Sequence, residues 1–446
     1  MTGQLRALWL AIRASYWFIP SVLTILAFLG GLGTLWIDRT TGTEWLEGVG
    51  VELARPEGAR SQLTVIASAM ISIASTVFAI TIAAVVYASG NYGPRLLTNF
   101  MNDRGNQVSL GVFIATFVYN LTVLRAVQSA ERLALAGLSP EEAAQGYVPQ
   151  VSLLVSAGSV LLAVGVLVYF LHHVPASIRI NSVLGGIGRR LLHDIEARFP
   201  EPGSHDAAAV RESGRPLPAE RTGYVEIIDF ATLDRIARSH GLRLALAIRT
   251  GDFLHPPRPM LFLLAGDVDP KVARRLHDCF SLGNSRTPTQ DLEFLLDELV
   301  EIASRALSPG VNDPFTAITS MHWMAAALSA LAGRDLGRGP EQDSYDPVRV
   351  QPLADDFAHF LRRSFGELRP SAATSAIAAK MFVDALAGIL PAATGPARRN
   401  ALMEEAQRFG CQVEQALSGP ARAEVFERLQ SILPAAASEA RRPAGD

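Results

Sequence analysis

Four stretches without a charged side chain dominate the first 174 residues of the chain. They cover residues 14–37, 61–94, 105–124 and 143–171. A helix rises about 1.5 Å per residue, so about 20 residues cross the roughly 30 Å hydrocarbon layer of a bilayer. Each stretch is long enough. The pattern predicts four transmembrane helices, over residues 16–37, 64–89, 107–126 and 150–172 of a transmembrane domain that ends at residue 174.

The basic residues between these stretches predict how the chain is threaded. Arg6 and Arg13 precede the first stretch, Arg95 and Arg104 lie in the second connection, and Arg179 follows the fourth stretch. The first and third connections carry more acidic than basic residues. Because positively charged connections stay in the cytoplasm, both termini and the second connection of this multi-pass membrane protein are expected there.

The second connection, NYGPRLLTNFMNDRGNQVSLG, has two readings. Pro94 suits the first position of a short helix, which could lie in the headgroup layer with Arg95 near anionic lipid. Alternatively, Arg95 and Asp103 couple the membrane helices to the cytoplasmic part as a gating element.

Two segments of the chain resemble a known family. GPRLLTNFMNDRGNQVSLGVFIATFVYNL and RALSPGVNDPFTAI, which begin at Gly93 and Arg305, are similar to the bacterial predicted membrane proteins grouped as domain of unknown function 2254. The resemblance extends over nearly the whole chain. It implies a membrane protein of this plan, and it implies no activity, cofactor or catalytic residue.

Small hydroxyl side chains recur at helical spacing in the second and fourth stretches. Such a face permits close helix packing or lines a pathway for water or ions, and both readings stay open. No acidic, basic or histidine side chain lies in mid-span, which argues against a proton-coupled transporter. The candidate residues are Ser68, Ser72, Ser75, Thr76, Asn120, Ser152, Ser156 and Ser159.

The remainder of the chain reads as a cytoplasmic region. Residues 175–222, rich in Pro, Gly and charge, predict a membrane exit and flexible linker. The glycines Gly185, Gly186 and Gly188, before Arg189, favour a flexible exit. A small α/β domain is expected over 223–285, an α-helical domain over 286–434 and a disordered tail over 435–446. The charge-free residues 315–333 favour a buried core helix over a fifth span. The fold class is an α-helical integral membrane protein with a mixed α/β plus α-helical C-terminal region.

Residue signals place several helix ends in this region. Asp229 and Asp269 are expected to cap helices, and Thr287–Gln290 has the spacing of a capping box. Residues 308–313 read as a turn, with Gly310 at positive φ and Asp313 as the next cap. The sharper reading is that Arg305, Asn312 and Asp313 form a polar contact with a ligand or subunit.

The composition of the chain limits the kinds of ligand and reaction that it can serve. With 40 Lys and Arg against 43 Asp and Glu, no basic field favours nucleic acid. Two cysteines make neither a disulfide framework nor a zinc site, and no catalytic or cofactor motif is present. The sequence therefore predicts a non-enzymatic protein without cofactor or metal, with the lipid bilayer and further copies of itself as partners.

The favoured function is an oligomeric channel or transport protein with a regulatory or assembly domain. The alternative is a membrane-anchored sensor or scaffold that binds a partner or small ligand through its cytoplasmic domain.

Overall fold

The computed structural model describes residue 12 and residues 15–41, 54–93, 103–129, 146–203, 214–337, 341–353, 356–430 and 432–433. Two compact units divide at Arg179 and Ile180, and we call them the N-terminal unit and the C-terminal unit. The expected short helix after Pro94, the candidate Arg95 and the expected disordered tail lie outside the described residues.

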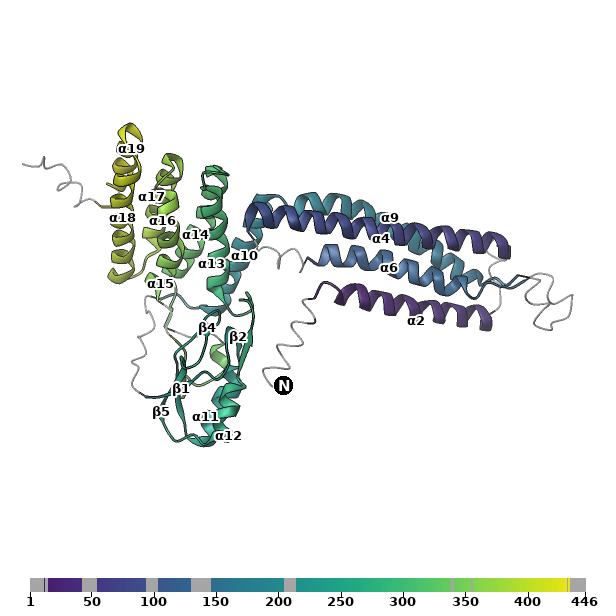
Figure 1. The fold of residues 1–446 in the computed structure, drawn as a ribbon, viewed down its shortest axis with the longest axis horizontal. Coiled ribbons are helices and arrows are strands. Elements are labelled where there is room, and N and C mark those ends of the chain that lie inside the picture. Colours follow the sequence, from purple (N-terminus) through teal and green to yellow (C-terminus); the bar gives the residue numbers. More distant parts are fainter. Residues whose placement is uncertain are drawn as a thin grey trace, which may run out of the picture. The chain divides into compact units, whose positions relative to one another are not determined.

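The N-terminal unit consists of long apolar helices that run side by side, with α6 lying between α2 and α4 (Figure 1). Their buried faces hold small and aromatic side chains such as Ala74, Phe113 and Phe170. Within the described residues five helices are long and apolar enough to cross a bilayer, and four of them belong to this unit. The four are α2 (Phe18–Thr41), α4 (Pro56–Tyr92), α6 (Arg104–Leu124) and α9 (Gln150–Ser177).

The fifth candidate is α14 (Pro314–Ala332), which lies in the C-terminal unit. It buries Met321, Met324 and Leu328 completely. Its neighbours are α10 (Ile180–Arg198), α13 (Leu292–Ala306) and α17 (Ala376–Ile389). α14 is long and apolar enough to cross a bilayer, but it packs as a core helix does. The number of helices that cross the membrane stays a prediction.

The segment expected to be a flexible membrane exit is instead partly a regular helix. In α10 the side chains of Leu184, Leu191 and Ile195 are fully buried. Gly188 lies directly against the indole ring of Trp323 in α14. The glycine cluster that suggested flexibility therefore allows a close helix–helix contact, and of the expected linker only residues 204–213 lie outside the described residues.

Two small sheets form the α/β part, and they draw strands from beyond the expected 223–285. The four-stranded sheet has the order β1-β5-β3-β7 and the three-stranded sheet the order β4-β2-β6. All neighbours are antiparallel except β3 and β7. The strands are β1 (Arg215–Pro218), β2 (Gly223–Ile228), β3 (Arg243–Leu246), β4 (Phe253–Leu254), β5 (Pro259–Ala265), β6 (Phe280–Gly283) and β7 (Val350–Gln351).

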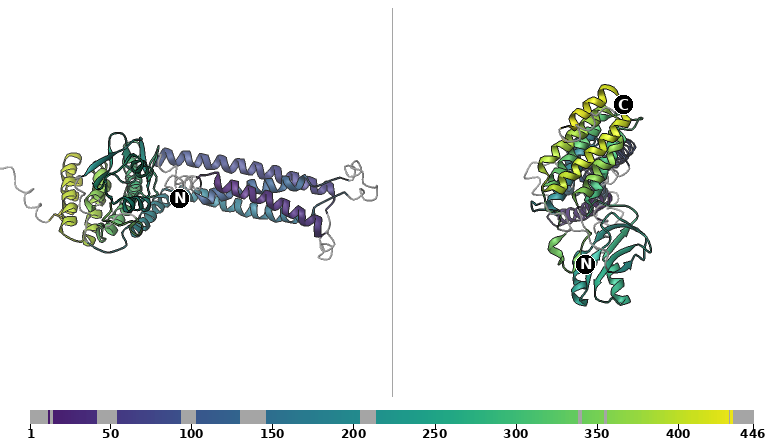
Figure 2. Two further views of the ribbon diagram at one scale, coloured as in Figure 1. Left: turned by 90° about the horizontal axis from the view of Figure 1, so that it is seen from below. Right: turned by 90° about the vertical axis from the view of Figure 1, so that its left-hand side faces the viewer.

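Helices complete the C-terminal unit. α11 (Phe230–His240) and α12 (Pro270–His277) pack with the strands around a common apolar core. The C-terminal helices lie side by side in both views of Figure 2. The first is a continuous run of α15 (Phe357–Leu361), the π-helical turn η3 (Arg362–Gly366) and α16 (Glu367–Ala372). The others are α17, α18 (Pro396–Ala416) and α19 (Gly419–Leu429), and two 3₁₀ turns are η2 (Gln342–Ser344) and η4 (Leu390–Ala392).

The aspartate caps are confirmed, and two other local predictions are wrong. Asp229, Asp269 and Asp313 each accept the backbone N–H three residues later. The capping box at Thr287–Gln290 does not form, because α13 begins later with Asp291 as its cap. In the 308–313 turn the residue at positive φ is Asn312, at 49°, and not Gly310.

We predict that two neighbouring glycines of α10 respond in opposite ways to alanine. A Cβ at Gly188 would collide with the Trp323 ring, whereas a Cβ at Gly186 has no atom within 4 Å. Gly188→Ala should lower the free energy of unfolding by about 1–3 kcal/mol through overpacking. Gly186→Ala should raise it by up to about 1 kcal/mol through helix propensity. Denaturant unfolding of the detergent-solubilised protein measures both, and equal effects would contradict the contact.

Candidate functional site

Asp38, near the end of α2, caps the beginning of α9. Its carboxylate oxygens accept the backbone N–H groups of Val151 and Ser152 at 2.8 and 3.0 Å, and the Ser152 hydroxyl at 2.6 Å. The residue at the cap position of α9 itself, Pro149, provides no side-chain bond. The first N–H groups of a helix have no intrahelical acceptor. A buried carboxylate from another helix supplies it here.

The hydroxyl groups around Asp38 extend this cluster to α6. The Thr34 hydroxyl lies 3.0 Å from the Ser152 hydroxyl, and Tyr119 donates to the Ser152 carbonyl at 3.1 Å. Gln150 pairs with both the N–H and the carbonyl of Ala54, each at 3.1 Å. We call Thr34, Asp38, Tyr119, Gln150 and Ser152 the Asp38 cluster.

A second polar contact lies deeper between α6 and α9. Asn120 and Ser156 are both fully buried, and the Ser156 hydroxyl donates to the Asn120 side-chain oxygen at 2.5 Å. The Asn120 amide donates to the Thr116 carbonyl, and the half-buried Ser159 hydroxyl donates to the Ser156 carbonyl. These hydroxyl and amide groups are engaged in helix packing, so for them the packing reading is favoured over the pathway reading.

The hydroxyl face of α4 has a different position. Ser68, Ser72, Ser75 and Thr76 are exposed in the chain, because α4 packs through Ala67, Met70, Ala74 and Val77 on its other face. The hydroxyls of Ser72, Ser75 and Thr76 donate to carbonyls one turn earlier in α4. We call these four residues the α4 hydroxyl face. A single chain therefore does not enclose the polar face from which a pathway was inferred.

Asp103 forms the corresponding cap at the opposite end of α6. It accepts the N–H of Gly105 at 2.7 Å and lies 2.8 Å from Nε2 of His173 in α9. His173 also stacks on Tyr169. His173 of α9 thus contacts the residue that caps α6. Ser152 and His173 are 21 positions apart in α9, about 32 Å of helix, which matches the roughly 30 Å hydrocarbon layer.

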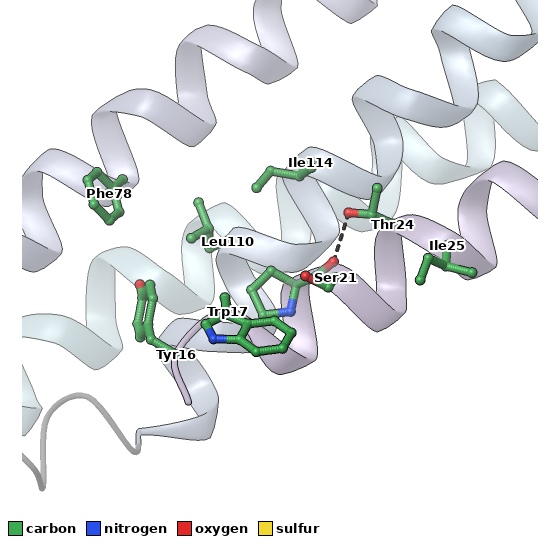
Figure 3. Close-up of a pocket in the computed structure, with 9 residues that line it drawn as sticks. Tyr16, Trp17, Ser21, Thr24, Ile25, Phe78, Leu110 and Ile114 are labelled. Carbon is green, nitrogen blue, oxygen red and sulfur yellow. Dashed lines mark hydrogen bonds between the residues drawn. The ribbon is translucent and has the colours of Figure 1, made fainter. Parts of the chain in front are cut away.

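An apolar groove of about 580 Å³ lies on the N-terminal unit between α2 and α4, with Leu110 and Ile114 of α6 among its lining residues (Figure 3). Ile25 lines it from α2, Trp17 lines it from the turn before α2, and Phe78 lines it from α4. The Thr24 hydroxyl at its edge is already bonded to the Pro20 carbonyl at 2.7 Å. Its surface suits hydrocarbon and offers little to a polar ligand.

The C-terminal unit contains a buried ion-pair network that the sequence did not reveal. Arg286 holds Asp291 at 2.7 Å and also pairs with Asp297. Arg363 pairs with Asp297 at 2.7 Å. Glu293 of α13 is contacted by Arg249 at 2.9 Å and by His359 at 2.7 Å. Because Arg249 follows β3 whereas Arg363 and His359 come from the helical part, the network joins the α/β part to the helices.

The network shifts the pKa values of its acids in opposite directions. Burial raises the pKa of Asp291 to about 6, despite the neighbouring Arg286. Burial also opposes ionisation of Glu293, but the His359 hydrogen bond and the charges of Arg249 and Arg363 lower the pKa of Glu293 to about 2. Buried charges persist only when they are paired. The network is therefore a structural connection, and its donors are occupied.

The imidazole of His277 and the thiol of Cys279 do not form a catalytic pair. Burial raises the pKa of the Cys279 thiol to about 12, and its Sγ donates to the Arg275 carbonyl. His277 Nε2 lies 2.9 Å from the Pro218 carbonyl. Among the residues described, no group of three or more His, Cys, Asp or Glu side chains could hold a metal ion.

The candidates Asn312 and Asp313 lie on an exposed loop between α13 and α14, which Arg305 of α13 precedes. The Asp313 carboxylate is engaged by the Thr316 N–H at 3.2 Å and the Thr316 hydroxyl at 2.6 Å. Asn312 contributes the left-handed backbone of the turn. The turn-and-cap reading therefore accounts for Asn312 and Asp313.

We predict that the cap on α9 needs the Asp38 carboxylate. Asp38→Ala leaves the N–H groups of Val151 and Ser152 without their acceptor, at a cost of about 1–3 kcal/mol per buried group. Asp38→Asn keeps one acceptor oxygen and should cost less. Thermal unfolding in detergent, followed by size-exclusion chromatography, measures the order wild type, Asn, Ala. Glu57→Gln, at an exposed site near the start of α4, is the control, and an Asp38→Ala variant as stable as this control would refute the role.

A further prediction concerns Glu293. Its pKa is lowered in the folded state, so its stabilisation is present above the unfolded pKa of about 4.5 and is lost as the pH falls towards about 2. Glu293→Gln should lower the free energy of unfolding by about 3 kcal/mol at pH 7, and the difference should shrink below pH 4.5. Intrinsic tryptophan fluorescence, to which Trp323 contributes, measures the free energy of unfolding of both proteins in denaturant. Glu424→Gln, which removes an exposed pair with Lys380, should change the midpoint little; a pH-independent Glu293→Gln deficit would argue against the ion pairs.

The chain is similar to membrane proteins of bacteria. Uncharacterized proteins of Mycobacterium bovis and Mycobacterium tuberculosis are each 28% identical to it over 414 residues, which is 85% of this chain and 75% of theirs. No solved structure matches the chain significantly. The family described as predicted membrane protein (DUF2254) matches residues 13–388. The chain, a membrane protein with several apolar helices, belongs to this family.

Proposed function

We propose that the protein is an oligomeric channel or transport protein of a bacterial inner membrane, with its pathway between copies of the chain. The observation that carries the proposal is the outward direction of the α4 hydroxyl face. The buried hydroxyls of Ser152 and Ser156 are used in helix packing. A polar lining that passes ions or water must then come from α4 and from more than one copy.

The membrane placement that accompanies this proposal has four crossing helices, α2, α4, α6 and α9. The excess of arginine before α2 and after α9 orients both termini towards the cytoplasm. The caps at Asp38 and Asp103 would then lie at opposite faces of the bilayer, which the length of α9 between Ser152 and His173 supports. α14 would remain in the cytoplasmic region, which serves regulation or assembly.

The proposal predicts that bulk on the α4 hydroxyl face blocks conduction. Purified protein in liposomes should pass ions or small solutes, Ser72→Ala should retain the flux because the face stays small, and Ser72→Leu should reduce it by about tenfold or more through occlusion. Gly165→Leu is the matched control, since Gly165 is exposed on α9 and a Cβ added there would meet no atom within 4 Å. Its flux should equal that of the wild type.

Cross-linking tests the oligomer independently of flux. Ser72→Cys should form disulfides between copies in a Cys411→Ser background, and Gly165→Cys should not. A bilayer that stays silent across ions and membrane tension, with Ser72→Cys chains that never cross-link, would overturn the proposal. That result would favour the membrane-anchored sensor or scaffold.

A further inference from the structure

The loop formed by residues 307–315 is held in one shape by its own hydrogen bonds. The N–H groups of Val311 and Asn312 donate to the Ser308 carbonyl at 3.1 and 2.9 Å, and the Asp313 N–H donates to the Ala306 carbonyl at 2.8 Å. Asp313 then caps α14 through Thr316. The turn residues thus fix the directions of the side chains around them.

This ordered loop exposes apolar side chains. Phe315 is 68% exposed and Val311 is 52% exposed, and both belong to the large exposed hydrophobic side chains of the C-terminal unit. Pro309 and Gly310 next to them are also exposed. Single exposed apolar residues are ordinary, but an apolar pair fixed on a hydrogen-bonded loop indicates a surface that is covered in use.

The helix packing within the C-terminal unit shows which end of α10 adjoins this loop. Gly188 contacts Trp323, and eleven residues later the Phe199 carbonyl accepts from Arg334 at 2.7 Å. The two helices therefore run parallel in a constant register. Extended backwards by eight residues from Gly188 and Trp323, that register brings Phe315 level with Ile180, the first residue of α10.

The chain connects this end of α10 directly to an apolar helix. Only Ile178 and Arg179 separate Ile180 from Ser177, the last residue of α9. Since each residue spans at most about 3.6 Å, the start of α10 lies within about 11 Å of the end of α9. α9 is long and apolar enough to cross a bilayer. If α9 crosses a bilayer, chain connectivity alone keeps this end of α10 close to the headgroup layer.

We propose that Val311 and Phe315 insert into the lipid headgroup layer and dock the C-terminal unit on the membrane surface. The apolar side chains enter the boundary between headgroups and acyl chains, as those of interfacial segments do. The carboxylate of Asp313 can lie close to that layer because its hydrogen bonds to Thr316 are internal. This role requires that α9 spans the membrane, and it requires neither conduction nor an oligomer.

Spin labels on the full-length protein in liposomes test the docking. In a Cys411→Ser background, which leaves the buried Cys279 as the native cysteine, a nitroxide is attached at Val311→Cys. Val348→Cys is the matched control, because Val348 is also exposed, at 63%, in the same unit. Leu161→Cys on α9, 74% exposed, provides the reference for hydrocarbon. Collision with oxygen reports lipid, and collision with a water-soluble nickel chelate reports water.

The expected result is a high ratio of oxygen to nickel accessibility at residue 311, shifted towards the ratio at 161, and a low ratio at 348. Phe315→Ser, which should leave the unfolding midpoint near that of the wild type, should lower the ratio at 311 to that at 348. A label at 311 as accessible to nickel as the label at 348 would overturn the proposal. Protection from both reagents would overturn it too, since it indicates a protein partner. A low ratio at 161 would show that α9 is not in lipid, and the docking proposal would fail with it.

Discussion

The N-terminal unit depends on the requirement that polar backbone groups at helix ends find partners where water is scarce. Asp103 meets this requirement locally at the start of α6, and Asp38 meets it from another helix at the start of α9. Each carboxylate accepts N–H groups at the positive end of a helix dipole. Asp38 lies near the end of α2, and Ser152 lies near the beginning of α9. Their interaction therefore also fixes which helix ends meet.

The same requirement governs what remains for function. Hydroxyl and amide groups between α6 and α9 are engaged with each other, so they contribute packing and orientation. Exposed hydroxyls of α4 bond to their own helix, which makes them tolerable beside lipid and equally suitable beside a second copy. The hydroxyls of the α4 hydroxyl face lie on the outer surface of the N-terminal unit, and the proposed pathway follows from that position.

The sequence predicted those features that local patterns determine. The charge-free stretches predicted the long helices, and the spacing of Asp229, Asp269 and Asp313 predicted helix starts, because a cap acts over three residues. Features that depend on distant residues were missed. The contact of Asp38 with Val151 spans 113 positions, and the Glu293–His359 pair spans 66. No local signal marks either pair.

Two wrong predictions show how tertiary contacts change the meaning of a local signal. Thr287–Gln290 has capping-box spacing, but Gln290 instead hydrogen-bonds the backbone of Ile228, and Asp291 begins the helix. The glycines between residues 185 and 188 in α10 suggested a flexible exit, whereas Gly188 lies directly against the ring of Trp323.

The capping-box prediction failed for a physical reason. A side chain with a strong local option takes a distant partner when that partner also satisfies a buried group. Gln290 pairs with both the N–H and the carbonyl of Ile228, at 3.0 and 3.3 Å, and so bonds strand β2 to the beginning of α13. These hydrogen bonds join two elements that the sequence assigned to separate domains. The boundary expected near residue 285 is therefore a packed and hydrogen-bonded junction.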